Sequence, residues 1–317
     1  MRNIKRIIAF LALILPLGCA QGPIPIIFDT DMGNDIDDAL ALAMLHRYVD
    51  EGRINLLAVP SSKTDSTSVP YIDLLNRWYG HPDIPVGKLT GIEQYERLNP
   101  YTEKTLDMGL WKESLLDCES APESWELIRD QLKKQKDNSV VIVAVGFFTN
   151  LSRLLSAEPV LVKKKVRQLV LMAGDFEGPE RTAEHNIRFD IDASRHICTE
   201  WPSPIVFSPF KVGMDILYPV SAILDNLNFH EPNPLVEAYK VYKKMPYDRP
   251  TWDLSAVLYA VEGAELFSLS ENGTVTVDDQ GKTWFESSPE GKHRFMSVPE
   301  DNQKVIKERY LELTYAK

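Results

Sequence analysis

The stretch Ile26-Ile-Phe-Asp-Thr-Asp-Met-Gly-Asn-Asp-Ile-Asp-Asp-Ala-Leu40 decides how the rest of the chain is interpreted. Apolar residues from Ile24 to Phe28 predict a buried strand, Gly33-Asn34 predicts a turn, and Ala39–Val49 has the pattern of a helix. Five aspartates lie at this junction, at positions 29, 31, 35, 37 and 38. Two carboxylates about 4 Å apart repel by about 4 kcal/mol at an effective dielectric of about 20. The aspartates must therefore point into water, take up protons or share a cation.

Apolar runs of strand length recur after this junction and alternate with amphipathic stretches. The runs are Asn55–Val59, Ser139–Val145, Gln168–Met172 and Pro204–Phe207. The helical patterns are Ala39–Val49, Val69–Tyr79, Ser124–Lys134, Asn150–Ser156 and Arg195–Thr199. Near-continuous apolar runs are typical of strands buried on both faces of a parallel sheet. The alternation predicts right-handed βαβ units and an α/β fold with a doubly wound, mostly parallel, Rossmann-like sheet.

The pattern changes after Val206. Residues 235–244 and 254–261 predict helices, and a last helix is expected from about Gln303 to Leu313. Gly273–Val277 and Thr283–Phe285 flank a turn sequence, which predicts a β-hairpin. The sequence has no internal repeat and no long linker, so we expect one domain, residues 24–317, that ends in helices and a hairpin.

Residues 1–18 predict a secretory signal outside the fold. Residues 1–6 carry three basic side chains, residues 7–17 are apolar, and Gly18, Cys19 and Ala20 are small. Cleavage before Cys19 would give a lipoprotein with an acylated cysteine, and cleavage after Ala20 would give a free secreted protein. We favour the lipoprotein, with residues 19–23 as a linker. The expected location is the periplasm or the outer membrane of a bacterium.

The charge and the cysteines narrow the set of partners. Removing residues 1–18, which carry three positive charges, takes the formal net charge from −11 to −14. An acidic protein is a poor partner for nucleic acid. No later segment approaches eighteen apolar residues, so contact with a membrane would depend on the lipid anchor. Cys118 and Cys198 fall in no Cys-x-x-Cys or Cys/His spacing and are expected to be buried free thiols.

The aspartate cluster favours a metal site. Carboxylates with neighbouring carbonyl oxygens are the ligands of Ca²⁺ or Mg²⁺, and the absence of nearby thiolates and histidines in the sequence disfavours zinc. Asp37 or Asp38 could instead cap the helix that follows and oppose its dipole. That role suits one or two aspartates and not five.

Two families begin with a hydrophobic strand followed by Asp-x-Asp. In the haloacid-dehalogenase-like phosphatases Gly-Thr normally follows, whereas Met32-Gly-Asn34 stands here, so that resemblance is partial. The chain is more similar to the nucleoside hydrolases, whose signature is Asp-Thr-Asp-Pro-Gly-x-Asp-Asp-Ala. It has Asp29-Thr-Asp-Met-Gly33 and then Asp37-Asp-Ala39. Further resemblances keep the family's order: Val145–Leu151 to a Gly-Pro-Leu-Thr-Asn segment, Met172–Gly174, Glu184–Asn186, Asp190–Ala193 and Trp252–Leu254.

The resemblance implies a bound Ca²⁺ and hydrolysis of the N-glycosidic bond of ribonucleosides. The carboxylates of Asp31, Asp38 and Asp253 and the backbone carbonyl of Thr149 would be the metal ligands. Asp31 would also be the base that deprotonates the attacking water, and Asp29 would support the site by hydrogen bonding. Thr149 and Asp253 also have a structural interpretation as helix N-caps.

The resemblance also implies the substrate contacts. Asp37 would accept a hydrogen bond from a ribose hydroxyl, and Glu184 and Asn186 would hold the other hydroxyls. Met172 would contact substrate from its Met-Ala-Gly segment. Asn186 could instead be a turn residue.

The chain departs from the family pattern in its loops. Met32 replaces the usual proline, and the first loop holds two more residues, so Asp35 has no family counterpart. Lys63 follows the second strand where the family has Gly-Asn; it could reach the sugar or a charged substituent, or lie on the surface. His185 replaces a phenylalanine and could touch substrate or face solvent.

Trp252 stands where inosine-uridine-preferring members carry a histidine as general acid and purine-preferring members carry a tryptophan. It favours base stacking over proton donation, with core packing as the alternative. We therefore expect an exported, calcium-dependent hydrolase of purine ribonucleosides that releases base and ribose, as in purine salvage. A haloacid-dehalogenase-like phosphatase and a non-catalytic calcium- or ligand-binding lipoprotein are the alternatives. The sequence is compatible with a homo-oligomer.

Overall fold

The computed structural model describes residues 22–93, 100–112, 114–177, 181–226 and 232–314. The strands of its main sheet are β1 Ile24–Asp29, β2 Ile54–Pro60, β3 Val86–Gly87, β4 Val140–Ala144, β5 Val166–Met172, β6 Ile205–Ser208, β9 Ser268–Leu269, β10 Gly273–Val277, β11 Thr283–Ser287 and β12 His293–Ser297. The strands β7 Leu217–Tyr218 and β8 Arg249–Pro250 form a separate two-stranded sheet.

The α-helices are α1 Asp37–Asp50, α2 Ser68–Trp78, α3 Tyr101–Leu106, α4 Ser124–Lys134, α5 Thr149–Ala157, α6 Pro159–Lys165, α7 His185–Phe189, α8 Ile191–Glu200, α9 Phe210–Asp215, α10 Pro234–Tyr242, α11 Trp252–Glu262 and α12 Glu300–Thr314. Two short helical segments, η1 Cys118–Ser120 and η2 Ala222–Asn226, complete the described elements.

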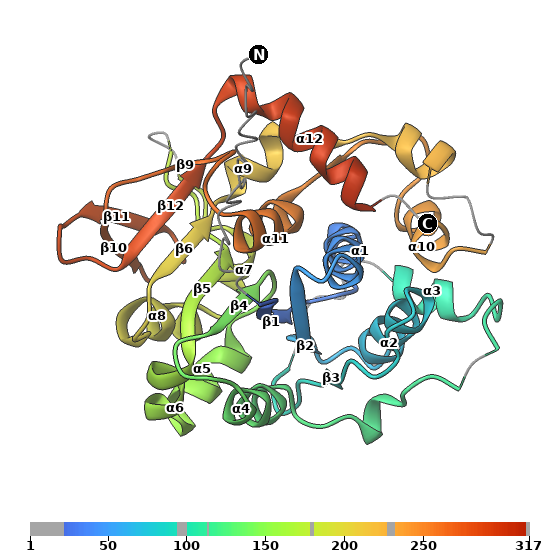
Figure 1. Ribbon diagram of the computed structural model, residues 1–317, viewed down its shortest axis with the longest axis horizontal. Coiled ribbons are helices and arrows are strands. Elements are labelled where there is room, and N and C mark those ends of the chain that lie inside the picture. Colours follow the sequence, from blue (N-terminus) through green and yellow to red (C-terminus); the bar gives the residue numbers. More distant parts are fainter. Residues whose placement is uncertain (1–21, 94–99, 113, 178–180, 227–231, 315–317) are drawn as a thin grey trace, which may run out of the picture.

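The sheet has the strand order β3-β2-β1-β4-β5-β6-β12-β10-β11 (Figure 1). From β3 to β6 every pair is parallel, and the order reverses between β1 and β4, which lie side by side. In open α/β sheets the ligand crevice lies outside the carboxyl ends of the strands at such a switch point. The predicted doubly wound, mostly parallel α/β fold is confirmed, and it brings the end of β1 next to the end of β4.

The central strands bury both faces, as their continuous apolar runs predicted. Ile26 and Phe28 belong to the core beneath α1, α2, α11 and α12, whereas Ile27 faces the core beneath α4, α5, α6 and α8. Strand β4 alternates in the same way, with Val141 and Val143 on the first face. Helices cover the two faces of the sheet in Figure 1. This double burial fixes the register of β1 and hence the position of the aspartates that follow it.

The C-terminal part extends the sheet. The predicted hairpin is present as the antiparallel pair β10–β11, and the predicted last helix is present as α12. Strand β12, which the sequence did not indicate, joins the hairpin to β6 by pairing parallel with β6 and antiparallel with β10. In the described part of the chain no helix has both the length and the hydrophobicity to cross a bilayer. The signal sequence and Cys19 lie outside the described residues.

Candidate active site

The carboxyl ends of β1 and β4 border a cavity of about 230 Å³. Close contact between the two strand ends depends on Gly146, because a Cβ there would lie 2.5 Å from the backbone nitrogen of Asp31. At Gly33 the backbone has φ +108°, a conformation that side chains disfavour. The cavity is lined by Asp31, Asn34, Asp35, Asp37, Asp38, Val145, Met172, Glu184, His185, Asn186, Phe210, Trp252 and Asp253.

Three of the lining carboxylates are buried without a basic partner. Asp31, Asp38 and Asp253 are 5%, 1% and 5% exposed, and no ion pair among the described residues joins them to a basic side chain. The Asn34 amide donates to Asp31, and the Thr30 hydroxyl donates to Asp38. Burial raises the pKa of Asp31 to about 7. Burial and then the charges of neighbouring aspartates raise the pKa of Asp38 and Asp253 well above the usual range.

These donors fit a hard divalent cation in their chemistry. All are oxygens, and a buried group of carboxylates needs protons or a cation for compensation. Among the described residues, no group of three or more histidine, cysteine, aspartate or glutamate side chains is preassembled around one point. The cavity therefore brings together oxygen ligands of the kind that a hard cation prefers, but three acidic side chains do not yet surround one point in the described part of the chain.

The residue that lines the cavity after β4 differs from the one expected. Thr149 does not line the cavity; it begins α5, and its hydroxyl donates to Asp190 at 2.5 Å. Val145 lines the cavity at the end of β4, four residues earlier, and its carbonyl accepts a hydrogen bond from Asn186 at 2.7 Å. The second lone pair of that carbonyl oxygen is the one available to a cation. The structure therefore places Val145, and not Thr149, against the cavity, and which carbonyl binds a cation stays a prediction.

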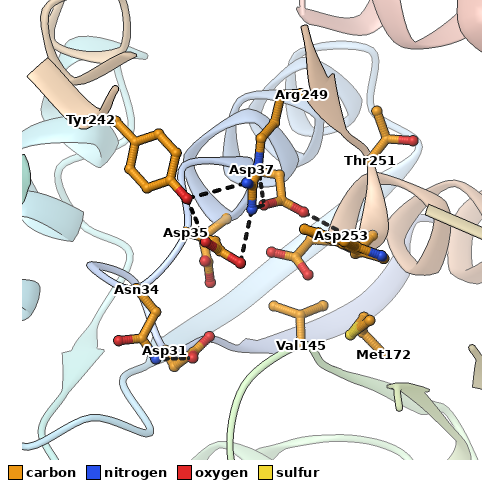
Figure 2. Close-up of polar contacts among 12 residues, drawn as sticks. Asp31, Asn34, Asp35, Asp37, Val145, Met172, Tyr242, Arg249, Thr251 and Asp253 are labelled. Carbon is orange, nitrogen blue, oxygen red and sulfur yellow. Dashed lines mark hydrogen bonds and ion pairs between the residues drawn. The ribbon is translucent and has the colours of Figure 1, made fainter. Parts of the chain in front are cut away.

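Asp37 has a different environment from the one expected of a sugar-binding residue. Its Oδ1 accepts hydrogen bonds from Nε and Nη2 of Arg249 at 3.1 and 2.8 Å, and its Oδ2 accepts from the backbone N–H of Asp253 at 3.3 Å (Figure 2). The Asp37 side chain is 1% exposed. Burial raises the pKa of Asp37, and the positive charge of Arg249 opposes that rise. Asp37 thus joins α1 to the segment around β8.

Arg249 contacts two of the lining aspartates and was not singled out from the sequence. Burial would lower the pKa of its guanidinium, but Asp37 and Asp35 outweigh burial and keep it charged. It contacts Asp35 as well as Asp37, with 2.8 Å between Nη2 and each carboxylate. Its only signal in the sequence is its place three residues before Trp252, in a segment with no motif.

Lys63 does not line the cavity. It is 3% exposed and lies behind the Met32–Gly33 turn, where a Cβ on Gly33 would come within 3.2 Å of its Nζ. Among the described residues it forms an ion pair with Asp65, whose Oδ2 lies 3.6 Å from Nζ. Burial lowers the pKa of Lys63, whereas the charges of Asp65 and Asp31 raise it. The predicted contact between Lys63 and substrate is not supported by this position, since the ammonium is enclosed by the protein.

Glu184 and Asn186 line the cavity and also hold its wall together. Glu184 caps α7, because its Oε1 accepts from the N–H of Asn186 at 2.9 Å and its Oε2 from Ile187 at 3.2 Å. The Asn186 amide donates to the carbonyls of Val145 and Met172 at 2.7 and 3.0 Å. The backbone N–H of Gly174 also donates to Oε2 of Glu184 at 3.3 Å, so the Glu184 carboxylate accepts three hydrogen bonds from the protein. Met172 lines the same wall and is 4% exposed.

An aromatic wall borders the cavity on the side of the C-terminal half. The Trp252 ring stacks on Phe210 with centroids 5.3 Å apart, and its indole N–H donates to the Phe210 carbonyl at 2.9 Å. The Arg249 guanidinium lies 4.8 Å from the Trp252 ring centre. Phe210, which the sequence analysis did not single out, is 38% exposed. Phe210 therefore offers the more accessible aromatic surface, and Trp252 supports it.

Two further predicted residues take distinct positions. Asp29 is fully buried below the cavity, where the Asn150 amide donates to its Oδ2 at 3.2 Å. His185 lines the cavity, and its Nε2 is buried without a hydrogen-bond partner in the described part of the chain. The histidine thus faces the cavity rather than bulk solvent.

The fold and the site define a doubly wound α/β protein with an acidic cavity at its switch point, the place where such proteins bind small molecules. The chain belongs to the nucleoside hydrolase family, because the model of the inosine-uridine preferring nucleoside hydrolases matches residues 26–309. This family comprises hydrolases that act on N-glycosyl bonds, and the resemblance inferred from the sequence is confirmed.

Known relatives agree with this assignment. A non-specific ribonucleoside hydrolase, RihC, of Klebsiella pneumoniae (strain 342) is 27% identical over 181 residues, which are 55% of this chain and 57% of that relative. The match thus spans little more than half of the relative's length. A plant nucleoside hydrolase, PpNRh1, superposes with a TM-score of 0.74 at 19% identity over 93% of this chain and 100% of its own. A purine-preferring ribonucleoside hydrolase from Gardnerella vaginalis gives 0.70 at 19% identity, over 92% and 99%.

Proposed function

We propose that this protein hydrolyses the N-glycosidic bond of ribonucleosides, prefers purine ribonucleosides and depends on Ca²⁺. One observation carries the proposal: buried Asp31, Asp38 and Asp253 line the same cavity as Glu184 and Asn186, at the switch point of a nucleoside hydrolase fold. The oxygen atoms of these side chains can coordinate a cation and can accept hydrogen bonds from the hydroxyls of a sugar.

Asp31, Asp38, Asp253 and the Val145 carbonyl would hold the cation. When bound, the cation orients a water molecule and sugar hydroxyls and makes the water a better nucleophile. The oxygen-only donor set favours calcium or magnesium over zinc. We choose calcium because flexible oxygen ligands of mixed type suit its larger coordination sphere.

Asp31 is our candidate for the base. Its carboxylate lines the cavity and, kept ionised by the cation, could accept a proton from the attacking water. The Asn34 amide donates to Oδ2 and fixes the orientation of the carboxylate. Cleavage of an N-glycosidic bond develops positive charge on the sugar, as in other glycoside hydrolyses, and the surrounding carboxylates favour that charge.

The leaving base would lie against the aromatic wall. Phe210 and Trp252 offer a flat apolar surface, and stacking of a base on an aromatic side chain contributes about 1–3 kcal/mol. The larger ring system of a purine gains more from this surface than a pyrimidine does. His185, with Nε2 buried in the wall, is the cavity group that can supply a proton to the departing base.

A substrate panel separates this function from its alternatives. The purified mature protein is incubated with purine and pyrimidine ribonucleosides, with a chelator or with added Ca²⁺, and released reducing sugar is measured. Release from purine ribonucleosides that stops with chelator and in Asp31→Asn supports the proposal. Phosphate release from p-nitrophenyl phosphate would favour the phosphatase, and calcium binding without either reaction would favour a binding protein.

We also propose that the protein is exported and anchored by a lipid on Cys19. The basic, apolar and small-residue segments of residues 1–20 support this. Fractionation of cells that express the full chain and a Cys19→Ser variant tests it. Membrane association of the first and not the second is expected, whereas equal distribution of both would contradict the anchor.

A further inference from the structure

Asp35 and Asp37 both border the cavity, but they differ in accessibility. The Asp35 side chain is 44% exposed, and the Asp37 side chain is 1% exposed. Asp35 belongs to the stretch that the family signature lacks. Of these two carboxylates, the one with the larger accessible surface is thus in the inserted stretch.

The hydrogen bonds of Asp37 leave it little capacity for a substrate. An ionised carboxylate offers about four lone-pair positions. Oδ1 of Asp37 accepts two N–H groups from Arg249, and Oδ2 accepts the backbone N–H of Asp253. Oδ1 is therefore saturated and Oδ2 has one lone pair left, so Asp37 could not accept hydrogen bonds from two adjacent hydroxyls unless it lost a donor inside the protein, where a lost hydrogen bond is costly.

Asp35 is held firmly and still has acceptor capacity. Its Oδ1 accepts from the Tyr242 hydroxyl at 2.6 Å, and its Oδ2 lies 2.8 Å from Nη2 of Arg249 (Figure 2). Arg249 Nη1 in turn donates to the Tyr242 hydroxyl at 3.1 Å, which closes a ring of three side chains. The backbone carbonyl of Asp35 accepts from Tyr101 at 2.9 Å. Each carboxylate oxygen of Asp35 therefore has one partner within the protein and the capacity to accept one more hydrogen bond.

We propose that Asp35, and not Asp37, is the carboxylate that accepts hydrogen bonds from the vicinal hydroxyls of the substrate sugar. Tyr242 and Arg249 are positioning residues that set its orientation. Asp37 acts as the buried anchor for Arg249. This inference rests on the proposed function, since it names the sugar contact of the same cavity.

Arg249 links the inserted stretch to the buried aspartate at the start of α1. Arg249 neutralises one carboxylate of an already acidic cavity, and the same guanidinium binds the carboxylate of Asp35. A rigid, pre-oriented acceptor loses less entropy when it binds a hydroxyl than a mobile one does. A ligand with two adjacent hydroxyls is the chemical class that matches one carboxylate with two open lone pairs.

The test compares Asp35→Asn with Asp37→Asn, and Asp279→Asn serves as the control because the Asp279 side chain is 97% exposed. For each variant we measure kcat/KM on inosine, 2′-deoxyinosine and 3′-deoxyinosine, and the midpoint of thermal unfolding. Asp35→Asn should lower kcat/KM on inosine by about 10- to 100-fold, the effect of one charged hydrogen bond, and lower it far less on the deoxynucleosides. Tyr242→Phe should show the same pattern with a smaller loss.

Asp37→Asn keeps an Oδ1 that can accept hydrogen bonds from Arg249 but loses the charge, so it should lower the unfolding midpoint and leave the preference for the vicinal hydroxyls intact. A loss of that preference in Asp37→Asn, with none in Asp35→Asn, would overturn the inference. If the wild type cleaves no nucleoside, the proposed function fails, and calorimetric binding of inosine and 2′-deoxyinosine then decides the inference separately. Weaker binding of inosine alone by Asp35→Asn would support it. Equal binding of inosine by the variant and the wild type, or no binding by the wild type, would overturn it.

Discussion

The two walls of the cavity differ in chemistry and in origin. The wall from the β1–α1 junction is anionic and buried, with Asp31 and Asp38 no more than 5% exposed. The wall from the C-terminal half is aromatic and more open, with Phe210 38% exposed. A nucleoside has the same division, because its sugar is polar and its base is flat and largely apolar on its faces. Under the proposed function, the contrast assigns the sugar to the anionic wall and the base to the aromatic wall.

Arg249 connects these two regions. It lies in β8, contacts the Trp252 ring on the aromatic side and binds Asp37 on the anionic side. Asp31, Asp38 and Asp253, which form no ion pair with a basic side chain among the described residues, are the aspartates suited to a cation. Substitutions in one wall, or at Arg249, test whether the other wall depends on it.

The largest effect is expected from removing the charge of the anionic wall. Asp31→Asn should lower kcat on ribonucleosides by about 10²–10⁴-fold, because the variant loses the base and one donor to the cation. Binding of a free purine base at the aromatic wall should change little. Steady-state kinetics and base-binding measurements check this. A variant with near wild-type kcat would remove Asp31 from the chemistry.

The connection between the walls should matter most for stability. Arg249→Gln should lower the free energy of unfolding by about 3–5 kcal/mol, because it leaves the buried Asp37 carboxylate without its partner. Asp37→Asn combined with Arg249→Gln should cost less than the two single losses together, since neither partner is then left charged. Urea unfolding of the four proteins measures this cycle. Strict additivity would show that the pair does not act as a unit.

The anionic wall should give the metal-free protein an unusual pH dependence. Burial raises the pKa of Asp31 to about 7 in the folded state, so the folded protein holds this proton more tightly than the unfolded chain does. The free energy of unfolding in chelator should therefore fall as the pH rises from about 4 to about 7, by up to about 4 kcal/mol from this residue. Saturating Ca²⁺ should remove the fall because it binds the ionised carboxylates. Unfolding in chelator that becomes harder across this range would contradict the account, and Asp31→Asn is the control.

The smallest effect is expected at the aromatic wall. Phe210→Ala should raise KM for purine ribonucleosides about tenfold and for pyrimidine ribonucleosides less, because one stacking surface is lost. Trp284→Phe is a matched control, since Trp284 is 50% exposed and does not line the cavity. Equal losses on purines and pyrimidines would show that Phe210 supports the wall without contacting the base.

The sequence predicted the parts of this site that depend on regular structure. The apolar run Ile24–Phe28 has a strand buried on both faces, and that burial fixes where Asp29 and Asp31 emerge. The end of the third apolar run at Val145 was also predicted, although the residue that lines the cavity there is Val145 itself and not the expected Thr149. A backbone carbonyl carries no side-chain signature, so its position depends on where the strand ends, and sequence predicts strand ends least well.

The sequence could not predict contacts between segments that lie far apart along the chain. Arg249 and Asp37 are 212 positions apart and meet because β8 lies over the start of α1. An isolated arginine in an irregular segment looks like a surface residue. The same difficulty applies to Lys63, whose burial behind the Met32–Gly33 turn has no local signal in the sequence.

The most direct test of the central claim is the stoichiometry of products from the wild-type protein. Inosine is incubated with metal-free protein, then with protein supplied with Ca²⁺, and hypoxanthine and ribose are quantified by chromatography. The account predicts equal amounts of base and free ribose, formed only when the cation is present and absent in Asp31→Asn. Formation of both products at the same rate in chelator, or no cleavage of any ribonucleoside with Ca²⁺ bound, would contradict it.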